Sequence, residues 1–261
     1  MGPAVDYGRL SEEVLGIRNA PPELARRLVA QALVVEDRSD RWVALGERVC
    51  ATAPERPAVY VLQDAAGSAL YVGKATNLRR RLRTHFSRRR WRALKTEFAR
   101  VADARWEEVG SELEALLREA EWIHLLRPVV NVQIGLPALE TRGIPRALLR
   151  DTIVVTRSLD PEAAELVALR PDGDWFIQRT RRSGADLLGH TNRLMQFFHS
   201  RLRRRGDRLP LAAIGFSWLA GRGATASRLD PHEVASPTEL RRRITSLLAD
   251  ETLFAERIIV R

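Results

Sequence analysis

Cysteine is nearly absent from this sequence, in which Cys50 is the only one among 261 residues. A single thiol excludes an internal disulfide framework and a zinc site built from several thiolates, and it favours a reducing compartment. Long apolar runs are also lacking, because the longest, residues 209–219, is too short to cross a bilayer. The first ten residues lack the basic start and the apolar centre of a signal peptide. We therefore expect a cytoplasmic protein.

Acidic side chains are scarce in residues 74–105, which contain twelve lysines and arginines but only Glu97 and Asp103. This block has a net charge of +10, which equals the net charge of the whole chain, so the remaining residues sum to zero. A basic surface concentrated in this way is typical of proteins that bind a polyanion. A solvated, arginine-rich helix face is the alternative interpretation.

The chain divides into three segments, and their mixture of helical and strand patterns predicts an α+β protein. Residues 1–52 predict two helices followed by a strand hairpin over residues 33–45, as in a winged helix. A packing or partner-docking role suits this unit equally well. Residues 55–134 predict a small antiparallel three-stranded sheet flanked by helices.

Residues 150–261 predict a further α+β module of unknown role. Strands are expected at 152–157, 164–170, 174–180, 211–218 and 258–260, with a hairpin turn at Pro171-Asp172-Gly173. One helix is expected over about 185–202. Ser236 and Glu239 form a capping box for another, with proline at its first position.

The middle segment contains the stretch PAVYVLQDAAGSALYVGKATNLRRRLRTHF, residues 57–86. Apolar residues alternate on either side of a turn-forming sequence at residues 64–67, as in two half-buried strands. A hairpin that closes symmetrically about residues 65 and 66 places Tyr60 directly opposite Tyr71, on the same face. The spacing therefore predicts two neighbouring tyrosines on the sheet.

A basic helix is predicted directly after this hairpin, with Thr76 or Asn77 as its N-cap. Its buried stripe recurs every four residues at Leu78, Leu82 and Phe86.

Two polar side chains of this helix, Arg81 and His85, lie one turn apart beside the stripe and are placed to lean over the tyrosine face. A third strand is expected at 104–109. Ser111 and Glu114 then form a capping box for a helix that carries Glu119 on the shoulder of its apolar face.

Tyrosine, lysine and arginine in this arrangement suit the hydrolysis of a phosphodiester. The reaction needs a base for the attacking water and cations for the developing phosphorane charge. A tyrosine hydroxyl ordinarily titrates near pH 10, so Tyr71 needs a neighbouring cation to act as the base. Lys74, three residues later, is the candidate, because a cation at about 4 Å contributes about 4 kcal/mol at an effective dielectric of about 20.

These motifs resemble those of the GIY-YIG nuclease family, in the form found at the front of the bacterial excinuclease subunit UvrC and in its single-incision homologue Cho. Ala58-Val59-Tyr60 and Tyr71-Val72-Gly73 match the two tripeptides that name the family. GKATNLRRRL and ELEALLREAEWIHLLRPVVNV are similar to the two segments that follow them. The resemblance covers about 75 residues.

The resemblance implies a role for each matching side chain. Tyr71 would be the general base, assisted by Lys74, and Tyr60 would help to order water or phosphate. Arg81 would stabilise the transition state, and His85 takes a position often filled by Tyr or His.

The resemblance also implies a metal site and a surface for DNA. Glu119 would bind a single Mg²⁺ or Mn²⁺ that retains several waters. Gly73, Asn77 and Asn131 would support the site. The arginines expected to contact DNA are Arg79, Arg80, Arg83, Arg88, Arg89 and Arg90.

The function implied by the resemblance is a single, metal-dependent incision in damaged duplex DNA during nucleotide excision repair. A full excinuclease C carries a second nuclease domain and tandem helix-hairpin-helix motifs, for which this chain is too short. The implied partners are lesion-containing double-stranded DNA, which would place the protein on the nucleoid, and a damage-recognition protein of the UvrB type. Two alternatives stay open: a restriction or mobile-element nuclease of the same family, and a non-catalytic DNA-binding protein that retains the fold.

Overall fold

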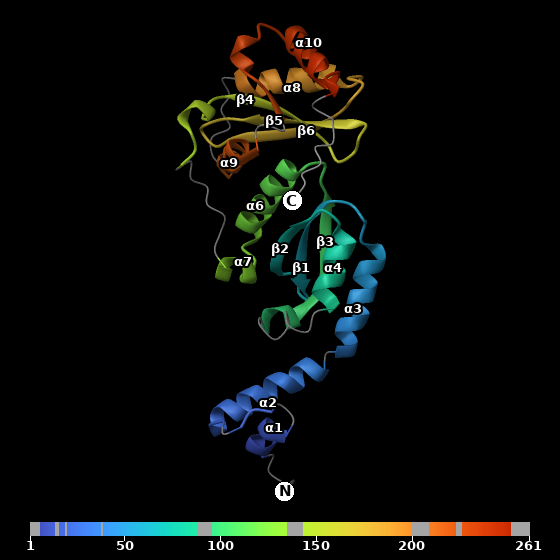
Figure 1. Ribbon diagram of the computed structural model, residues 1–261, viewed down its shortest axis with the longest axis vertical. Coiled ribbons are helices and arrows are strands. Elements are labelled where there is room, and N and C mark those ends of the chain that lie inside the picture. Colours follow the sequence, from blue (N-terminus) through green and yellow to red (C-terminus); the bar gives the residue numbers. More distant parts are fainter. Residues whose placement is uncertain are drawn as a thin grey trace.

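The chain forms an elongated molecule with two separate sheets (Figure 1). The computed structural model describes residues 6–13, 16–18, 20–37, 39–87, 96–134, 143–199, 209–222 and 226–251. Helices α1 (Tyr7–Glu13) and α2 (Pro22–Asp37) lie at one end, a three-stranded sheet lies in the middle, and a four-stranded sheet lies at the other end. The α+β class expected from the sequence is confirmed.

The middle of the molecule is an antiparallel sheet in the order β2-β1-β3, with helices on both faces (Figure 1). Its elements are α3 (Ser39–Thr52), β1 (Ala58–Asp64), β2 (Ala69–Ala75), α4 (Leu78–Ser87), the 3-10 helix η1 (Thr96–Arg100), β3 (Val101–Glu108), α6 (Glu112–Leu126) and α7 (Val129–Ile134). α3 and α4 cover the face that carries Tyr60 and Leu62, whereas α6 covers the face that carries Val59 and Val61. The central strand β1 is therefore buried on both sides.

The β1–β2 hairpin pairs in a different register from the one predicted. Tyr60 lies opposite Gly73, and Tyr71 lies opposite Leu62, so the pairing is shifted by two residues. The prediction that the two tyrosines are directly opposite is wrong. Because a shift of two residues preserves the alternation of side chains, both tyrosines still point to the same face.

The turn chemistry explains the shift. The Asp64 backbone N–H donates to the Ser68 carbonyl at 3.0 Å, and Gly67 adopts a positive φ of 81°. The loop therefore holds three residues and uses the left-handed conformation of glycine, in place of the symmetric two-residue turn. The register irregularity that accompanies it lies between Leu62 and Gln63.

α4 begins as predicted, with Asn77 rather than Thr76 as its N-cap. The Asn77 side-chain oxygen accepts a hydrogen bond from the Arg80 backbone N–H at 2.9 Å. The stripe formed by residues 78, 82 and 86 is buried against the sheet and α3. This packing fixes which side of α4 faces the tyrosines.

The strand hairpin predicted for residues 33–45 is wrong, and with it the winged-helix interpretation of residues 1–52. Residues 22–37 and 39–52 form α2 and α3. Trp42, Val49 and Cys50 face α4 at helical spacing and join the core around Tyr60. The Trp42 indole N–H also donates to the Phe86 carbonyl at 2.8 Å. This tertiary packing outweighs the strand propensity of the local sequence.

The C-terminal module is an antiparallel sheet in the order β6-β5-β4-β7. Its elements are η2 (Arg146–Leu148), β4 (Thr152–Arg157), β5 (Ala163–Leu169), β6 (Trp175–Arg181), α8 (Leu187–His199), α9 (Ala212–Arg222), β7 (Ala226–Leu229), η4 (Pro231–Glu233) and α10 (Pro237–Leu248). α8 and α10 cover one face, and α9 covers the other together with α6. α6 therefore contributes to the cores of both sheets.

The first three strands predicted for this module are confirmed, as are the hairpin turn, where Gly173 has a φ of 102°, and the capping box of α10. The strand expected at 211–218 is wrong, because this segment belongs to α9. A short apolar run fits a buried helix as well as a strand. The strand expected at 258–260 lies outside the described residues. Among the helices described, none is long and apolar enough to cross a membrane.

Candidate active site

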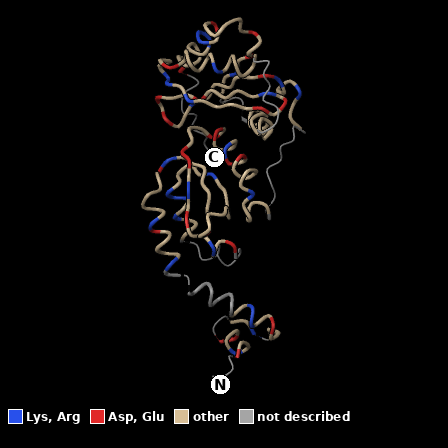
Figure 2. Tube along the Cα trace, turned by 180° about the vertical axis from the view of Figure 1, so that it is seen from behind, with Lys and Arg blue, Asp and Glu red and all other residues tan. Residues whose placement is uncertain are grey.

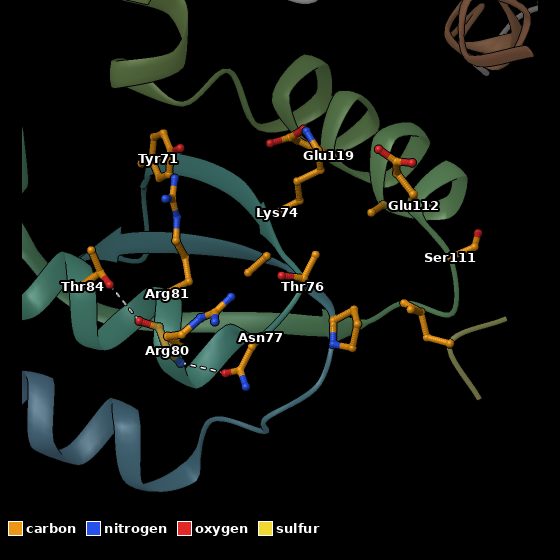
Figure 3. Close-up of a pocket in the computed structure, with 14 residues that line it drawn as sticks. Tyr71, Lys74, Thr76, Asn77, Arg80, Arg81, Thr84, Ser111, Glu112 and Glu119 are labelled. Atoms are coloured by element: carbon orange, nitrogen blue, oxygen red, sulfur yellow. Dashed lines mark hydrogen bonds and ion pairs between the residues drawn. The ribbon is translucent and has the colours of Figure 1, made fainter. Parts of the chain in front are cut away.

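A cleft of about 740 Å³ opens between α4, the end of β2 and the first half of α6 (Figure 3). Six of the residues predicted from the sequence line it: Tyr71, Lys74, Asn77, Arg80, Arg81 and Glu119. They come from a strand and two helices that the fold brings together around one edge of the middle sheet. The structure therefore assembles the central part of the predicted site in one place.

Tyr60 and His85 lie behind the wall of this cleft, in the core between the sheet and α4. Tyr60 is 0% exposed and His85 is 4% exposed. The Tyr60 hydroxyl and His85 Nε2 are 2.5 Å apart, and Arg81 Nε donates to the Tyr60 oxygen at 3.4 Å. These contacts are satisfied together when the Tyr60 hydroxyl donates to His85 and accepts from Arg81.

Burial fixes the protonation state of this pair. Desolvation, followed by the proximity of Tyr71, raises the pKa of Tyr60 far above its ordinary value. Desolvation, followed by the positive charge of Arg81, lowers the pKa of His85 to about 4. At neutral pH the pair is therefore a neutral phenol bonded to a neutral imidazole, and Tyr60 is unsuited to act as a base.

Tyr71 is the tyrosine that reaches the cleft. Its ring centroid lies 6.0 Å from that of Tyr60 and 5.8 Å from that of His85. Figure 3 shows the Arg81 guanidinium directed at Tyr71. Burial opposes the charge on Arg81, but hydrogen bonding to Tyr60 and the interactions with Tyr71 outweigh this effect and raise the pKa of Arg81. A permanent cation therefore lies beside both tyrosines.

Lys74 forms an ion pair with Glu119 inside the cleft. Lys74 Nζ donates to Glu119 Oε2 at 2.6 Å, which joins β2 to α6 (Figure 3). The sequence suggested Lys74 as the cation that assists Tyr71, and that role stays a prediction. The structure adds Arg81 as a second cation placed to do so.

The capping box predicted for α6 is confirmed, and it fixes the start of the helix that carries Glu119. The Ser111 hydroxyl oxygen accepts from the Glu114 backbone N–H at 3.1 Å, and a Glu114 carboxylate oxygen accepts from the Gly110 N–H at 2.6 Å. Leu113 and Leu117 are fully buried against the C-terminal module. With that side anchored, Glu119 faces the cleft.

Two further predicted residues hold the edge strand β2 in place. The Asn131 carboxamide accepts from the Val72 N–H at 2.8 Å and donates to the Val72 carbonyl at 3.0 Å. A Cβ atom at Gly73 would lie 2.8 Å from both the Tyr60 hydroxyl oxygen and a ring carbon of Tyr71. Asn131 therefore fixes the backbone of β2 next to Tyr71, and Gly73 leaves the space that the two tyrosine side chains occupy.

The arginines predicted to contact DNA have different surroundings. Arg80 lines the cleft, and Arg83 is exposed on the outer side of α4. Arg79 is tied to the segment before β1, because it donates to the Ala53 carbonyl at 2.7 Å and to Glu55 at 2.9 Å. Basic residues occur along the side of the molecule formed by α3 and α4 (Figure 2). Arg88, Arg89 and Arg90 lie outside the described residues.

Sequence reasoning missed several residues that line the cleft, among them Thr84, Ser111, Glu112 and Leu159. Glu112 lies seven residues before Glu119 on α6, so helical spacing was a signal that could have found it. Leu159 comes from the loop between β4 and β5 in the C-terminal module, and no local pattern connects it to the motif segment.

Comparison with known proteins identifies the middle segment. Residues 56–132 match the model of the UvrC-like GIY-YIG domain. The UvrABC system protein C of Chlorobaculum tepidum is 41% identical over 93 residues, which are 35% of this chain and 15% of that protein. The same protein of Moorella thermoacetica is 36% identical over 88 residues, or 34% of this chain and 14% of that protein.

A solved structure of similar sequence is the GIY-YIG N-terminal endonuclease domain of UvrC from Thermotoga maritima, which is described as bound to its catalytic divalent cation, magnesium. It is 29% identical and covers 33% of this chain and 94% of that domain, with a TM-score of 0.30.

Residues 56–132 thus place this chain among the proteins with a GIY-YIG nuclease domain. More particularly, this domain is of the UvrC-like form, as the sequence motifs predicted. The chain matches no more than 15% of the length of the two UvrC proteins named above. All the elements of the C-terminal module, from η2 onward, lie beyond the residues that the family model matches.

Proposed function

We propose that the chain is a metal-dependent DNA endonuclease that makes a single incision in damaged duplex DNA during nucleotide excision repair. The observation that carries this proposal is the convergence of Tyr71, Lys74, Arg81 and Glu119 on one cleft. A phenol, two cations and a carboxylate can supply the base, the positive charge and the metal ligand that phosphodiester hydrolysis uses. Binding of DNA alone would need the cations but neither the phenol nor the carboxylate.

Tyr71 is proposed as the general base. Its side chain is on the wall of the cleft, whereas Tyr60 is buried and its raised pKa keeps it protonated. To act as a base, Tyr71 gives up its hydroxyl proton to solvent before it accepts one from the attacking water, and the Arg81 guanidinium directed at it is the cation beside that oxygen. Tyr60 and His85 orient the guanidinium of Arg81 through the bonds of 3.4 Å and 2.5 Å described above.

Arg81 and Lys74 are proposed to stabilise the charge that develops on the phosphoryl oxygens. A guanidinium has five N–H donors, so Arg81 can contact a phosphoryl oxygen and keep its contact with Tyr60. Lys74 has three donors on a flexible stem, and one of them is used by Glu119. Groups fixed in advance at the position of the charge lower the barrier most.

The residues of the cleft fit a divalent cation. The Glu119 carboxylate lines the cleft and is 20% exposed. Among the described residues no group of three or more His, Cys, Asp or Glu converges, and the second carboxylate of the cleft, Glu112, lies two helical turns away from Glu119. This suits Mg²⁺ or Mn²⁺, because such ions retain several waters beside one or two carboxylates. A cation bound to Glu119 would supply Lewis acidity to the phosphoryl oxygen.

The substrate is proposed to be lesion-containing duplex DNA, which would place the protein on the nucleoid. The basic block of residues 74–105 and the similarity to proteins of the UvrABC system support this substrate. The same similarity supports a damage-recognition partner of the UvrB type. A single incision is proposed because the part of the chain that the structure describes holds one such set of catalytic side chains.

The proposal is tested by nicking of a lesion-bearing duplex in Mg²⁺ or Mn²⁺, with the wild-type chain and with Glu119→Gln. The variant keeps the size of the side chain and an acceptor for Lys74 but removes the charge that binds the cation. Incision should fall by at least about 100-fold while DNA affinity is retained, and chelation of the metal should abolish incision in the wild type.

Glu121→Gln is the matched control, because Glu121 lies on the same helix but is paired with Arg118 at 3.0 Å and does not line the cleft. It should incise like the wild type. Absence of incision of any DNA by the wild type would instead favour the binding-only alternative. Equal incision of undamaged and damaged DNA at a defined sequence would favour a restriction or mobile-element nuclease.

DNA affinity should depend steeply on salt. Neutralising about six phosphates would lower affinity by about 10³-fold between 50 and 200 mM salt, because bound counterions are released. Fluorescence anisotropy of a labelled duplex across this range measures the slope. A flat response would contradict the assignment of the basic block to DNA.

A further inference from the structure

The C-terminal module reaches into the cleft of the nuclease domain through Leu159. The loop between β4 and β5 is fastened to Gly110, which precedes the N-cap of α6. The Leu159 backbone N–H donates to the Gly110 carbonyl at 2.6 Å, and the Ser158 hydroxyl donates to the same oxygen at 3.0 Å. Leu159 lines the cleft, yet the residue remains 57% exposed. The backbone of Leu159 is therefore held at the rim of the cleft, while its large apolar side chain is left largely open to solvent.

The two ends of the cleft differ in chemistry. Figure 3 shows Tyr71 at one end and Ser111 at the other. Arg81 lies at the Tyr71 end, and the other two cations of the lining, Lys74 and Arg80, lie between the two ends. Around Ser111 the lining is Pro57, Ala115, Leu159 and the carboxylate of Glu112, and none of these described lining residues is cationic. This end therefore disfavours a phosphate and presents apolar surface beside the Glu112 carboxylate, one oxygen of which accepts a hydrogen bond from the Trp218 indole N–H at 3.5 Å.

The distance along α6 suits one nucleotide unit. Glu112 and Glu119 are seven residues apart, which corresponds to about 10 Å along the helix axis. A scissile phosphate beside Glu119 and Arg81 would therefore leave room at the Ser111 end for the sugar and base attached to it. Sugars and bases have apolar faces and hydrogen-bond donors, whereas the phosphate carries the negative charge.

We propose that the Ser111 end of the cleft is a nucleoside subsite, and that Leu159 packs on the sugar or base next to the scissile phosphate. This rests on the proposed endonuclease function and adds to it a role for the C-terminal module, which completes the substrate-binding cleft. An apolar side chain that contacts a base or wedges beside it works best where the duplex is distorted, because unstacking a damaged base costs less. Leu159 is thus a specificity-determining residue for distorted DNA.

Photocrosslinking tests the position of Leu159 on the substrate. Benzoylphenylalanine is placed at 159 in the full chain carrying Glu119→Gln, and the crosslinked nucleotide is mapped relative to the bond that the wild type incises. The control places the same group at 188, because Leu188 is 59% exposed on α8 and does not line the cleft. Position 159 should crosslink within one nucleotide of the incised bond and at least about tenfold more than position 188.

Steady-state incision gives a second readout. Leu159→Ala should raise KM about fivefold on a distorted duplex and leave kcat within about twofold, since an apolar contact made equally in the ground and transition states is lost. Leu159→Met should restore KM, and Leu188→Ala should behave like the wild type. Incision without enriched crosslinking at 159, or with an unchanged KM in Leu159→Ala, overturns the subsite alone. Absence of incision by the wild type overturns the endonuclease function and the subsite with it.

Discussion

Tyr60 and Tyr71 share one face of the sheet but have different surroundings. Tyr60 is fully buried and bonded to His85 and Arg81, so its hydroxyl orients other groups. Tyr71 lines the cleft, where its hydroxyl can meet a water molecule. Two chemically identical side chains thus suit different tasks, because their burial and their hydrogen-bond partners differ.

Replacing each tyrosine by phenylalanine should separate these tasks. Tyr71→Phe should lower the incision rate by about 10²- to 10⁴-fold, the usual contribution of a general base, with little change in stability. Tyr60→Phe should lower the free energy of unfolding by about 1–3 kcal/mol, because His85 Nε2 is left buried without its donor. Single-turnover incision and urea unfolding measure the two effects. A Tyr71→Phe variant that incises at the wild-type rate would contradict the assignment of the base.

His85 should make stability depend on pH in a defined range. Its pKa of about 4 in the folded chain lies below the ordinary value of 6.5, so the unfolded chain binds a proton first as the pH falls. The stabilisation is complete above about pH 6.5 and is lost toward pH 4, by about 3 kcal/mol. Urea unfolding of the wild type across this range should show the decrease.

His85→Gln is the control for this prediction, because glutamine does not titrate and can still accept a hydrogen bond from Tyr60. The comparison removes the contribution of carboxylates that titrate in the same range, so the difference between the two chains isolates His85. Parallel curves for the two chains would contradict the prediction.

At the scale of the element, β2 lets the two tyrosines lie close together because its residue Gly73 has no side chain. Gly73 lies opposite Tyr60, and the Tyr60 hydroxyl and the Tyr71 ring occupy the space that a Cβ atom would need. The glycine is therefore required by close approach. Its φ is outside the left-handed region that Gly67 adopts in the preceding turn.

Gly73→Ala should lower incision by at least about tenfold and destabilise the chain by about 1–3 kcal/mol, as overpacking of a core does. The added methyl group has to displace the Tyr60 hydroxyl from Arg81 and His85. Gly189→Ala is the control, because outside its chain neighbours and the nearby backbone of α8 no atom lies within 4 Å of the position that a methyl group at this residue would occupy. That variant should be neutral or more stable by up to about 1 kcal/mol, since alanine favours a helix.

An element could be predicted from the sequence when the residues that determine it are neighbours in the chain. The stripe of α4, the capping boxes of α6 and α10, and the strands of the central motif follow from nearby residues, and the structure contains all of them. α3 could not be foreseen, because Trp42 and Val49 acquire their helical face only from contact with α4. The hairpin register depended on the three-residue loop, in which Gly67 takes a positive φ, and on the irregularity between Leu62 and Gln63.

For the whole molecule, the important contact is the interface between the two sheets. Arg179 of β6 donates to Glu165 at 2.8 Å and to Glu114 of α6 at 3.2 Å. Glu165 is 1% exposed, and burial, followed by the charge of Glu114, raises its pKa despite the pairing with Arg179. The charges at this interface are therefore mutually dependent, and Arg179 is the cation that balances two carboxylates.

Arg179→Met should destabilise the chain by about 3 kcal/mol at neutral pH, because a buried carboxylate loses its partner. Adding Glu165→Gln should recover most of the loss, since the unpaired charge is then removed. Thermal unfolding at pH 7 measures both. Arg182→Met is the control: its partner Glu251 is 85% exposed, so its loss should cost no more than about 1 kcal/mol. Equal effects of the two arginine variants would contradict the role of Arg179.

The sequence located the tyrosines, Lys74, Arg81 and Glu119 because they occur in one continuous motif segment with recognisable spacing. It did not locate Leu159 or the Arg179 bridge, which depend on how one module docks on another. Such contacts join residues far apart in the chain, and periodicity reports only on neighbours within an element.

Because α6 is buried on one side in the C-terminal module and lines the cleft on another, its rotation about its own axis is fixed from two directions. A turn of one residue, or about 100°, would remove Leu117 from one core and Glu119 from the cleft at the same time. Insertion of a single residue between Ser111 and Glu119 could therefore not be absorbed by sliding the helix. The carboxylate proposed to bind the metal is in this way aligned by a sheet that contains none of the proposed catalytic residues.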